Sequence, residues 1–134
     1  MEPSPIMELA MRYSAAWAAH DPDAIVAMHS EDSTFTVYGP DDPAVGRQAV
    51  RTAIAEIFAR SPDLSFEPKR VHFGTDHFVS EYVMRGTDSG NAFEVDGADV
   101  FTVVDGLIAR KDTYLDLLAY VQQTETAQPV ASEN

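Results

Sequence analysis

The sequence predicts one α+β domain, in which helices come first and a curved, mostly antiparallel sheet follows. Three observations support this prediction. Apolar residues recur at helical spacing up to about residue 60. From residue 64 onward they alternate as they do in strands. Short turn sequences separate those strands, so neighbouring strands can run antiparallel while the helices cover one face of the sheet and leave a pocket between the layers.

Three helices are predicted from their start signals and apolar faces. The Ser-Pro pair at 4–5 is typical of a helix start, and the Asp-Pro pair at 21–22 repeats the signal for a short second helix. We expect that second helix to end at the acidic pair 31–32. A third helix is predicted over 47–60. The apolar face of the first helix consists of Ile6, Leu9, Ala10, Tyr13, Ala16 and Trp17.

Five strands are predicted after the second helix. They cover 33–38, 64–73, 77–86, 91–104 and 107–118. Asp105 and Gly106 form the strongest hairpin signal between them. We expect residues 1–122 to form the domain, and residues 123–134, which are polar and lack periodicity, to form a disordered tail.

Composition narrows the classes of partner. The 134 residues include 22 acidic and 9 basic residues, for a net charge of −13. Nucleic acids and anionic membranes call for a basic patch, so we expect neither as a partner. The chain has no cysteine, which excludes disulfides, thiolate nucleophiles and cysteine metal sites. We see no signal peptide and no apolar run near the roughly 20 residues of a membrane helix, and so expect a cytoplasmic protein.

Asp99 is the most informative residue of the chain. It lies in the alternating run 92–104, and a strand points alternate side chains to opposite faces. The face that carries Asp99 consists of Phe93, Val95, Gly97, Asp99, Phe101 and Val103. A buried carboxylate must be paired, hydrogen-bonded or protonated. Asp99 is therefore either a candidate for proton chemistry or a structural acid held by an inward lysine or a hydroxyl.

Four stretches of the chain carry a resemblance to a known family. They are YSAAWAAHD at 13–21, MHSEDS at 28–33, GADVFTVVDGLI at 97–108 and YLD at 114–116. With this order of elements, the chain resembles the SnoaL-like polyketide cyclases and the ketosteroid isomerases of the nuclear transport factor 2-like superfamily. The likeness covers about residues 6–120. It implies a cone-shaped, cystatin-like fold with three N-terminal helices packed against the curved sheet.

The resemblance implies roles for two residues of the pocket. Tyr13 matches the tyrosine that donates into the oxyanion hole of ketosteroid isomerases. Asp99 matches the second donor of that hole, an aspartic acid that its apolar surroundings keep protonated in those enzymes. Lys111 leaves two alternatives open. If it reaches Asp99, the carboxylate is ionised and can act as a base; if it extends to solvent, Asp99 can be a neutral donor.

Other positions depart from the family patterns. The general base of the isomerases falls on Val37, and the acidic residue on the last strand of the cyclases falls on Thr113. The Arg-x-Asp of limonene-type epoxide hydrolases falls on Tyr82 and Met84, so that triad is absent. Asp112 is adjacent to Thr113, but a slip of one residue would reverse its face.

The resemblance also predicts an apolar, aromatic pocket. Its substrate-binding residues would be Trp17, Phe35, Val37, Tyr82, Met84, Phe101 and Thr113. With Asp99, Tyr13 and Lys111 as catalytic residues, the expected function is proton transfer of the isomerase or cyclase type on a hydrophobic cyclic or polyketide-like carbonyl compound. No cofactor and no metal are expected. The alternative is a non-catalytic ligand-binding or structural domain of the same fold.

Two further expectations concern a histidine and an interface. His29 is expected near the closed end of the pocket, either as a base or as a structural histidine bonded to the backbone. Apolar residues on the sheet face opposite the pocket, around 79–83 and 100–104, predict a homodimer.

Overall fold

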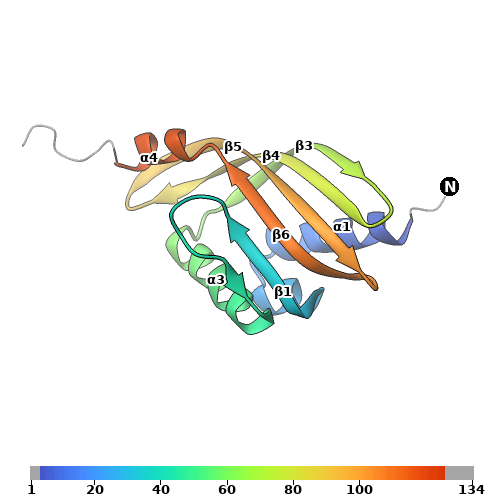
Figure 1. Cartoon of the computed structure of the whole chain (residues 1–134). Helices are drawn as coiled ribbons and strands as arrows, with labels where there is room; N and C mark the ends of the chain where they lie inside the picture. The colour runs from blue at the N-terminus through green and yellow to red at the C-terminus, as the bar shows by residue number, and fades with distance from the viewer. Residues whose placement is uncertain (1–3, 126–134) are drawn as a thin grey trace, which may run out of the picture.

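The computed structural model describes residues 4–125. In chain order the elements are α1 (Pro5–Ala18), α2 (Pro22–Val26), β1 (His29–Val37), β2 (Ala44–Val45), α3 (Arg47–Arg60), β3 (Ser65–Phe73), β4 (His77–Asp88), β5 (Asn91–Val104), β6 (Leu107–Leu115) and α4 (Leu117–Glu125). Helices α1, α2 and α3 lie on one side of the curved sheet, and α4 lies at its end (Figure 1). The predicted α+β class and arrangement are confirmed.

The sheet has the order β2-β1-β6-β5-β4-β3. Its neighbours pair antiparallel except β1 and β6, which run parallel. Strands β3 to β6 form the meander that the turn signals predicted. Pro68 lies on β3, an edge strand, where its missing N–H removes no bond from the interior of the sheet.

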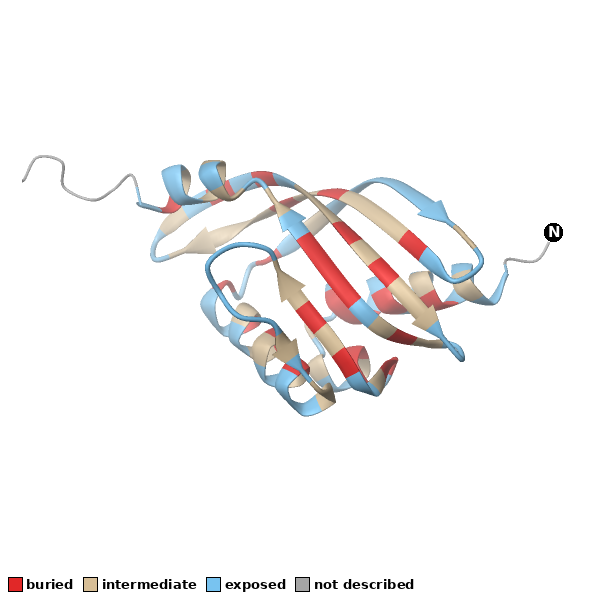
Figure 2. Ribbon diagram, viewed as in Figure 1, coloured by how far each residue is buried: buried red, intermediate tan, exposed pale blue. Residues whose placement is uncertain are grey.

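The helices begin where the sequence predicted. The Ser4 side chain accepts a hydrogen bond from the Met7 amide, and Asp21 does the same for Ala24. Buried positions alternate along β4 and β5 and follow one side of the helices, so the core lies between the two layers (Figure 2). The fully buried apolar side chains of that core are Ile25, Val50, Ile54, Phe78, Phe101 and Ile108.

The structure corrects the second helix. It ends at Val26 and not at the acidic pair 31–32, which lies within β1. The reason is tertiary pairing: the Ile108 amide donates to the Met28 carbonyl, which draws the chain into the sheet from His29 onward. The short strand β2 also lies in a segment that was expected to be a loop.

The C-terminal end differs from the prediction as well. Strand β6 ends at Leu115, three residues early, and α4 follows it. The Asp116 carboxylate starts that helix by accepting from the Ala119 amide at 3.0 Å. Residues 123–125 of the expected tail are helical, and residues 126–134 lie outside the described part of the chain.

Candidate functional site

A cavity of about 490 Å³ lies between α1 and strands β3 to β6. Most of its wall is apolar or aromatic. Helix α1 contributes Tyr13 and Trp17, because its apolar face points toward the sheet. Asp99 and Lys111 are polar groups of the wall that come from the two central strands β5 and β6. A cavity of this size and lining suits a small organic ligand.

Asp99 is only 7% exposed and accepts three hydrogen bonds. Its Oδ1 atom accepts from the Tyr82 hydroxyl at 2.8 Å and from the Thr113 hydroxyl at 2.6 Å. Its Oδ2 atom accepts from the ammonium of Lys111 at 3.2 Å. Both carboxylate oxygens therefore accept hydrogen bonds, and one of the three donors is a cation. Of the two alternatives that the sequence left open, the structure therefore shows the one in which Lys111 reaches Asp99.

The register of β5 and β6 brings these groups together. Next to the turn, Val104 pairs with Leu107 and Val103 with Ile108. Farther from the turn, an irregularity between Val103 and Thr102 shifts the pairing by one residue, so that Asp99 pairs with Thr113. Residues directly opposite each other in an antiparallel pair share a face. Without this bulge, Asp99 would pair with Asp112.

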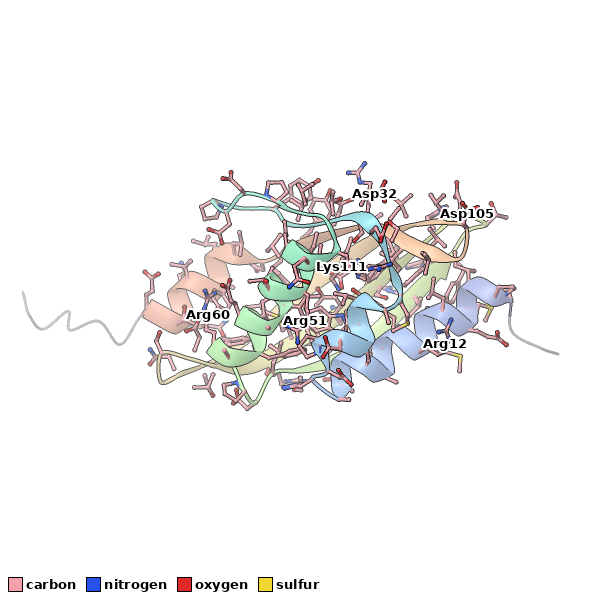
Figure 3. All side chains as sticks on the ribbon, turned by 90° about the horizontal axis from the view of Figure 1, so that it is seen from below. Arg12, Asp32, Arg51, Arg60, Asp105 and Lys111 are labelled. Atoms are coloured by element: carbon pink, nitrogen blue, oxygen red, sulfur yellow. The ribbon has the colours of Figure 1, made fainter. Side chains whose placement is uncertain are left out.

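Lys111 is surrounded by aromatic rings. Its Nζ atom lies 4.4 Å from the ring centroid of Trp17, 4.8 Å from Phe101 and 5.0 Å from Tyr13. Phe35 lies slightly farther away, at 5.5 Å. Such rings stabilise a cation through their electron-rich faces. Figure 3 shows Lys111 inside the fold, between the helices and the sheet.

The charge of Lys111 follows from two opposing effects. Burial is the largest single effect and disfavours the ammonium, but the interactions with Asp99 and Tyr13 together outweigh it, so the pKa of Lys111 is raised. A Schiff base requires a neutral amine as nucleophile, so this environment disfavours that chemistry. Lys111 instead supplies a fixed positive charge and hydrogen-bond donors at the polar end of the cavity.

Behind the cavity wall, Tyr13 is joined to a buried histidine and a buried serine. The Tyr13 hydroxyl lies 2.9 Å from His29 Nε2, and His29 Nδ1 lies 3.2 Å from the Ser33 hydroxyl. Arg47 donates to the backbone carbonyl of His29 through two nitrogens, at 2.7 and 3.1 Å. Burial, with Lys111 and Arg47 nearby, lowers the pKa of His29 to about 3, so the ring is neutral at pH 7.

The ten residues predicted for the site divide into two groups. Those that line the cavity are Tyr13, Trp17, Tyr82, Asp99, Phe101 and Lys111. The other four are not part of the lining: Phe35 and Met84 are buried in the core, Val37 pairs with Thr113, and Thr113 acts on the site through its bond to Asp99. Phe35 and Val37 lie on β1, which β6 separates from β5, β4 and β3, and Met84 lies two residues beyond Tyr82 along β4, so these three side chains pack in the core beside the cavity.

Strand β3 contributes cavity residues that the sequence reasoning missed. Phe66, Val71 and Phe73 line the cavity from this strand. The signal was present as an interrupted alternation: Phe66 occupies an even position, whereas Val71 and Phe73 occupy odd ones. The register shift between Pro68 and Arg70 explains the change of phase. Val71 and Phe73 are partly exposed at the cavity wall, as is Met11 of α1.

The described residues were also compared with the requirements of a metal site and of a membrane-spanning helix. Among residues 4–125, no group of three or more histidine, aspartate and glutamate side chains is placed to hold a metal ion. His72 instead contacts Glu81, and His77 contacts Asp76. None of the helices described between residues 4 and 125 combines the length and apolar character of a membrane span.

Fold and site together define the class of protein. A curved sheet under three N-terminal helices, with an apolar cavity around a few polar groups, is the architecture of the nuclear transport factor 2-like superfamily. A family model for the SnoaL-like domain matches residues 10–111, which is most of the chain. The chain therefore belongs to the SnoaL-like domain family.

Solved structures with the same fold are similar at low sequence identity. One is a protein of ketosteroid isomerase-like fold from Catenulispora acidiphila, solved with trimethylamine (21% identity, 87% of this chain and 92% of that chain covered, TM-score 0.79). A protein of the nuclear transport factor 2-like type from Burkholderia pseudomallei is 16% identical (90% and 98% covered, TM-score 0.82). TerC, co-crystallised with polyporic acid, is 17% identical (90% and 98% covered, TM-score 0.79). A comparison with curated proteins found no match.

Proposed function

We propose that this protein is a small-molecule enzyme that carries out proton transfer on a hydrophobic cyclic or polyketide-like carbonyl compound, with no cofactor. The observation that carries the proposal is the buried pair of Asp99 and Lys111 at the wall of an apolar cavity. A charged pair in such a place is costly to keep, because both ions lose their hydration. Ionisable groups that are buried and paired at the wall of a cavity are typical of sites that move protons.

The reaction would pass through an enolate. The Asp99 carboxylate would remove a proton from the carbon next to the substrate carbonyl, and the C–H electron pair would form the C=C bond while the carbonyl electrons move to oxygen. Lys111 and Tyr13 would stabilise that oxygen by hydrogen bonds. In an isomerisation, the protonated Asp99 then returns the proton to a different carbon. In a cyclisation, the enolate carbon bonds to a second carbonyl carbon, and the resulting alkoxide takes the proton.

The lining supports a hydrophobic substrate with few polar groups. Aromatic rings of Trp17, Phe66 and Phe101 surround the space next to Asp99. Flat apolar ligands gain dispersion and hydrophobic energy against such rings. Two proteins of similar fold were solved with small organic molecules, one with trimethylamine and one with polyporic acid, which supports a ligand-binding role for this chain.

Deuterium exchange into 2-tetralone, an apolar cyclic ketone, tests the proposal. The protein is incubated with the ketone in D₂O, and loss of the signals next to the carbonyl is followed by proton NMR. We expect wild-type protein to exchange these protons faster than buffer and Asp99→Asn to fall to the buffer rate. Because that variant leaves Lys111 unpaired, the double variant Asp99→Asn, Lys111→Met is measured with it. Asp96→Asn, on the outward face of the same strand, is the matched control and should keep the activity.

A ligand-binding protein without catalysis is the second candidate. It is favoured by the three donors on Asp99, which already occupy both oxygens of the carboxyl group, and by Val37 and Thr113 at the positions where relatives carry bases. Binding of 2-tetralone by the wild-type protein without any exchange above buffer would establish this candidate over the enzyme. Absence of binding would reject both.

A homodimer through the outer face of the sheet is part of the same proposal. Val79, Val83 and Val100 are only half-buried in the isolated chain, and Val104 is 52% exposed. Burying this face against a second copy would remove apolar surface from water. Light scattering should give twice the chain mass, and Val100→Glu should give a monomer. A monomeric wild-type protein at micromolar concentration would reject the dimer.

A further inference from the structure

A chain of buried hydrogen bonds ends at the cavity wall. It runs from the Ser33 hydroxyl to His29 Nδ1 (3.2 Å) and from His29 Nε2 to the Tyr13 hydroxyl (2.9 Å). Ser33 and His29 are fully buried, whereas Tyr13 lines the cavity. The two hydrogen bonds from Arg47 hold the backbone of His29 in place. The three side chains thus form one line from the closed interior to the ligand space.

Two arrangements of the protons fit these contacts, because a neutral imidazole carries one N–H. In the first, Tyr13 donates to Nε2 and the Nδ1–H group donates to Ser33. In the second, Ser33 donates to Nδ1, and the Nε2–H group donates to the Tyr13 oxygen. The Tyr13 hydroxyl hydrogen is free only in the second arrangement.

Hydrogen-bond accounting favours the second arrangement. In the first, the hydroxyl hydrogen of Ser33 has no acceptor among residues 4–125, and it lies where water does not reach. A buried donor left without an acceptor is destabilising. In the second, the group left without a protein partner is the Tyr13 hydroxyl hydrogen, which lies at the cavity wall and can meet water or a ligand.

We propose that Ser33 and His29 are positioning residues that hold the Tyr13 hydroxyl as a hydrogen-bond donor toward the cavity. Ser33 donates to His29 Nδ1, His29 Nε2–H donates to the Tyr13 oxygen, and Tyr13 O–H donates to an oxygen of the ligand. Each bond polarises the next, which strengthens the last donor. This inference rests on the proposed function in one respect: the ligand must carry an acceptor oxygen.

The charges around Tyr13 agree with this role. Burial raises the pKa of Tyr13, so its hydroxyl keeps the hydrogen at neutral pH. Lys111 lies on the same side, with Nζ 5.0 Å from the Tyr13 ring centroid. Tyr13 and Lys111 would therefore present donors to the same ligand oxygen.

The first test measures the His29 tautomer directly in the wild-type protein. Protein with ¹⁵N-labelled histidine is studied by long-range ¹H–¹⁵N NMR at pH 7, and the His29 signals are identified by their loss in His29→Gln. We expect the tautomer with hydrogen on Nε2 and none on Nδ1. The opposite tautomer would overturn the proposal, because Tyr13 would then donate to histidine and not to the cavity.

The second test measures what the relay does to a ligand. Binding of 2-tetralone is compared with that of tetralin, which has the same ring system without the oxygen. We expect Ser33→Ala to weaken 2-tetralone binding by about two- to tenfold, the worth of one hydrogen bond, and to leave tetralin binding unchanged. Ser33→Thr should restore the difference, and Ser30→Ala, on the same strand, should leave both affinities unchanged.

The outcomes separate this inference from the proposed function. An equal loss for both ligands in Ser33→Ala would show a merely structural role and overturn the relay. If the wild-type protein binds neither ligand, the proposed function fails, and the tautomer alone then supports or overturns the relay.

Discussion

Charged residues differ in exposure between the inner face of the sheet and the outer face of β3 to β5. On the inner face, Asp99 and Lys111 are 7% and 4% exposed, and each is held by hydrogen bonds or aromatic rings. On the outer face of β3 to β5, ion pairs are open to water, with side chains 29–72% exposed. Those pairs are Lys69–Asp96, Arg70–Glu81, Arg85–Glu67 and Arg85–Glu94.

Exposed and buried ion pairs contribute differently to the stability of the protein. Exposed ion pairs gain little, because water and salt screen them and the long side chains lose freedom. The two ions of a buried pair interact strongly, but each has lost its hydration. Removing one partner therefore leaves a buried charge without compensation, which destabilises the folded state. We therefore expect stability and function to depend on the few inner polar groups far more than on the many outer ones.

The largest expected effect is acid destabilisation through His29. Its pKa is about 3 in the folded protein and near 6.5 when unfolded, because burial opposes the imidazolium ion. The folded state thus binds fewer protons between these values, and the free energy of unfolding should fall by about 1.4 kcal/mol per pH unit, or about 5 kcal/mol in all, as pH drops from 6.5 to 3. Urea titrations at several pH values measure this slope.

The matched variants for this prediction are His29→Gln and His72→Gln. His29→Gln should flatten the slope over that range, because glutamine has no imidazole to protonate. His72→Gln, which alters an exposed histidine paired with Glu81, should leave most of it. Equal slopes in wild type and His29→Gln would show that protonation of His29 does not cause the acid destabilisation.

The next effect concerns the buried ion pair itself. Asp99→Asn leaves an unpaired ammonium and Lys111→Met leaves an unpaired carboxylate, so each should lower the free energy of unfolding by about 3–5 kcal/mol. The double variant should lose much less than the sum, because it removes both charges. Chemical denaturation of the four proteins completes the cycle. Additive losses would mean that the two groups do not interact.

A smaller effect on stability is expected at Gly97, where the backbone of β5 passes close to the ring of Tyr82. A Cβ atom at this position would lie 2.7 Å from the Tyr82 ring and 2.7 Å from Leu115 Cδ2. The Tyr82 hydroxyl is bonded to Asp99, so the ring cannot move away freely. Gly97→Ala should cost about 1–3 kcal/mol by thermal or urea unfolding. Leu115→Ala in the same chain should recover part of it, and an undisturbed midpoint would contradict the close approach.

The smallest effect is expected on the outer face. Arg85 pairs with Glu67 at 2.7 Å and with Glu94 at 3.1 Å, and its side chain is 42% exposed. Arg85→Met should shift the urea midpoint little at low ionic strength and not at all at high salt, because screening weakens the pairs that it removes. A loss comparable to that of Lys111→Met, or one insensitive to salt, would erase the contrast between the faces.

Much of the fold followed from local patterns. Caps at 4 and 21, the helical stripe of 47–60 and the turn at 105–106 lie where the sequence predicted them. The end of α2 and the helix α4 were not predicted, because both depend on partners distant in the sequence. His29 leaves helical structure to pair with Ile108, and α4 packs against β5.

Within the site, the sequence alone determined that Asp99 faces the core, because the period of a strand places every second side chain on the same face. It also placed Tyr13 and Trp17 on one helical stripe that points toward the sheet. These are local consequences of backbone geometry, so no knowledge of distant contacts was needed. The excess of acidic over basic residues also follows directly from the sequence.

Only the tertiary structure decided what Asp99 contacts. Opposite Thr102 and Val103 of β5, strand β6 contains one extra residue, which shifts the pairing of the two strands. As a result, Asp99 contacts the hydroxyl of Thr113 and the ammonium of Lys111 and does not face the carboxylate of Asp112. The relay from Ser33 through His29 to Tyr13 likewise joins α1 to β1 across the core. Register and packing are properties of the assembled sheet, because a slip of one residue changes few local interactions yet reverses every side chain beyond it.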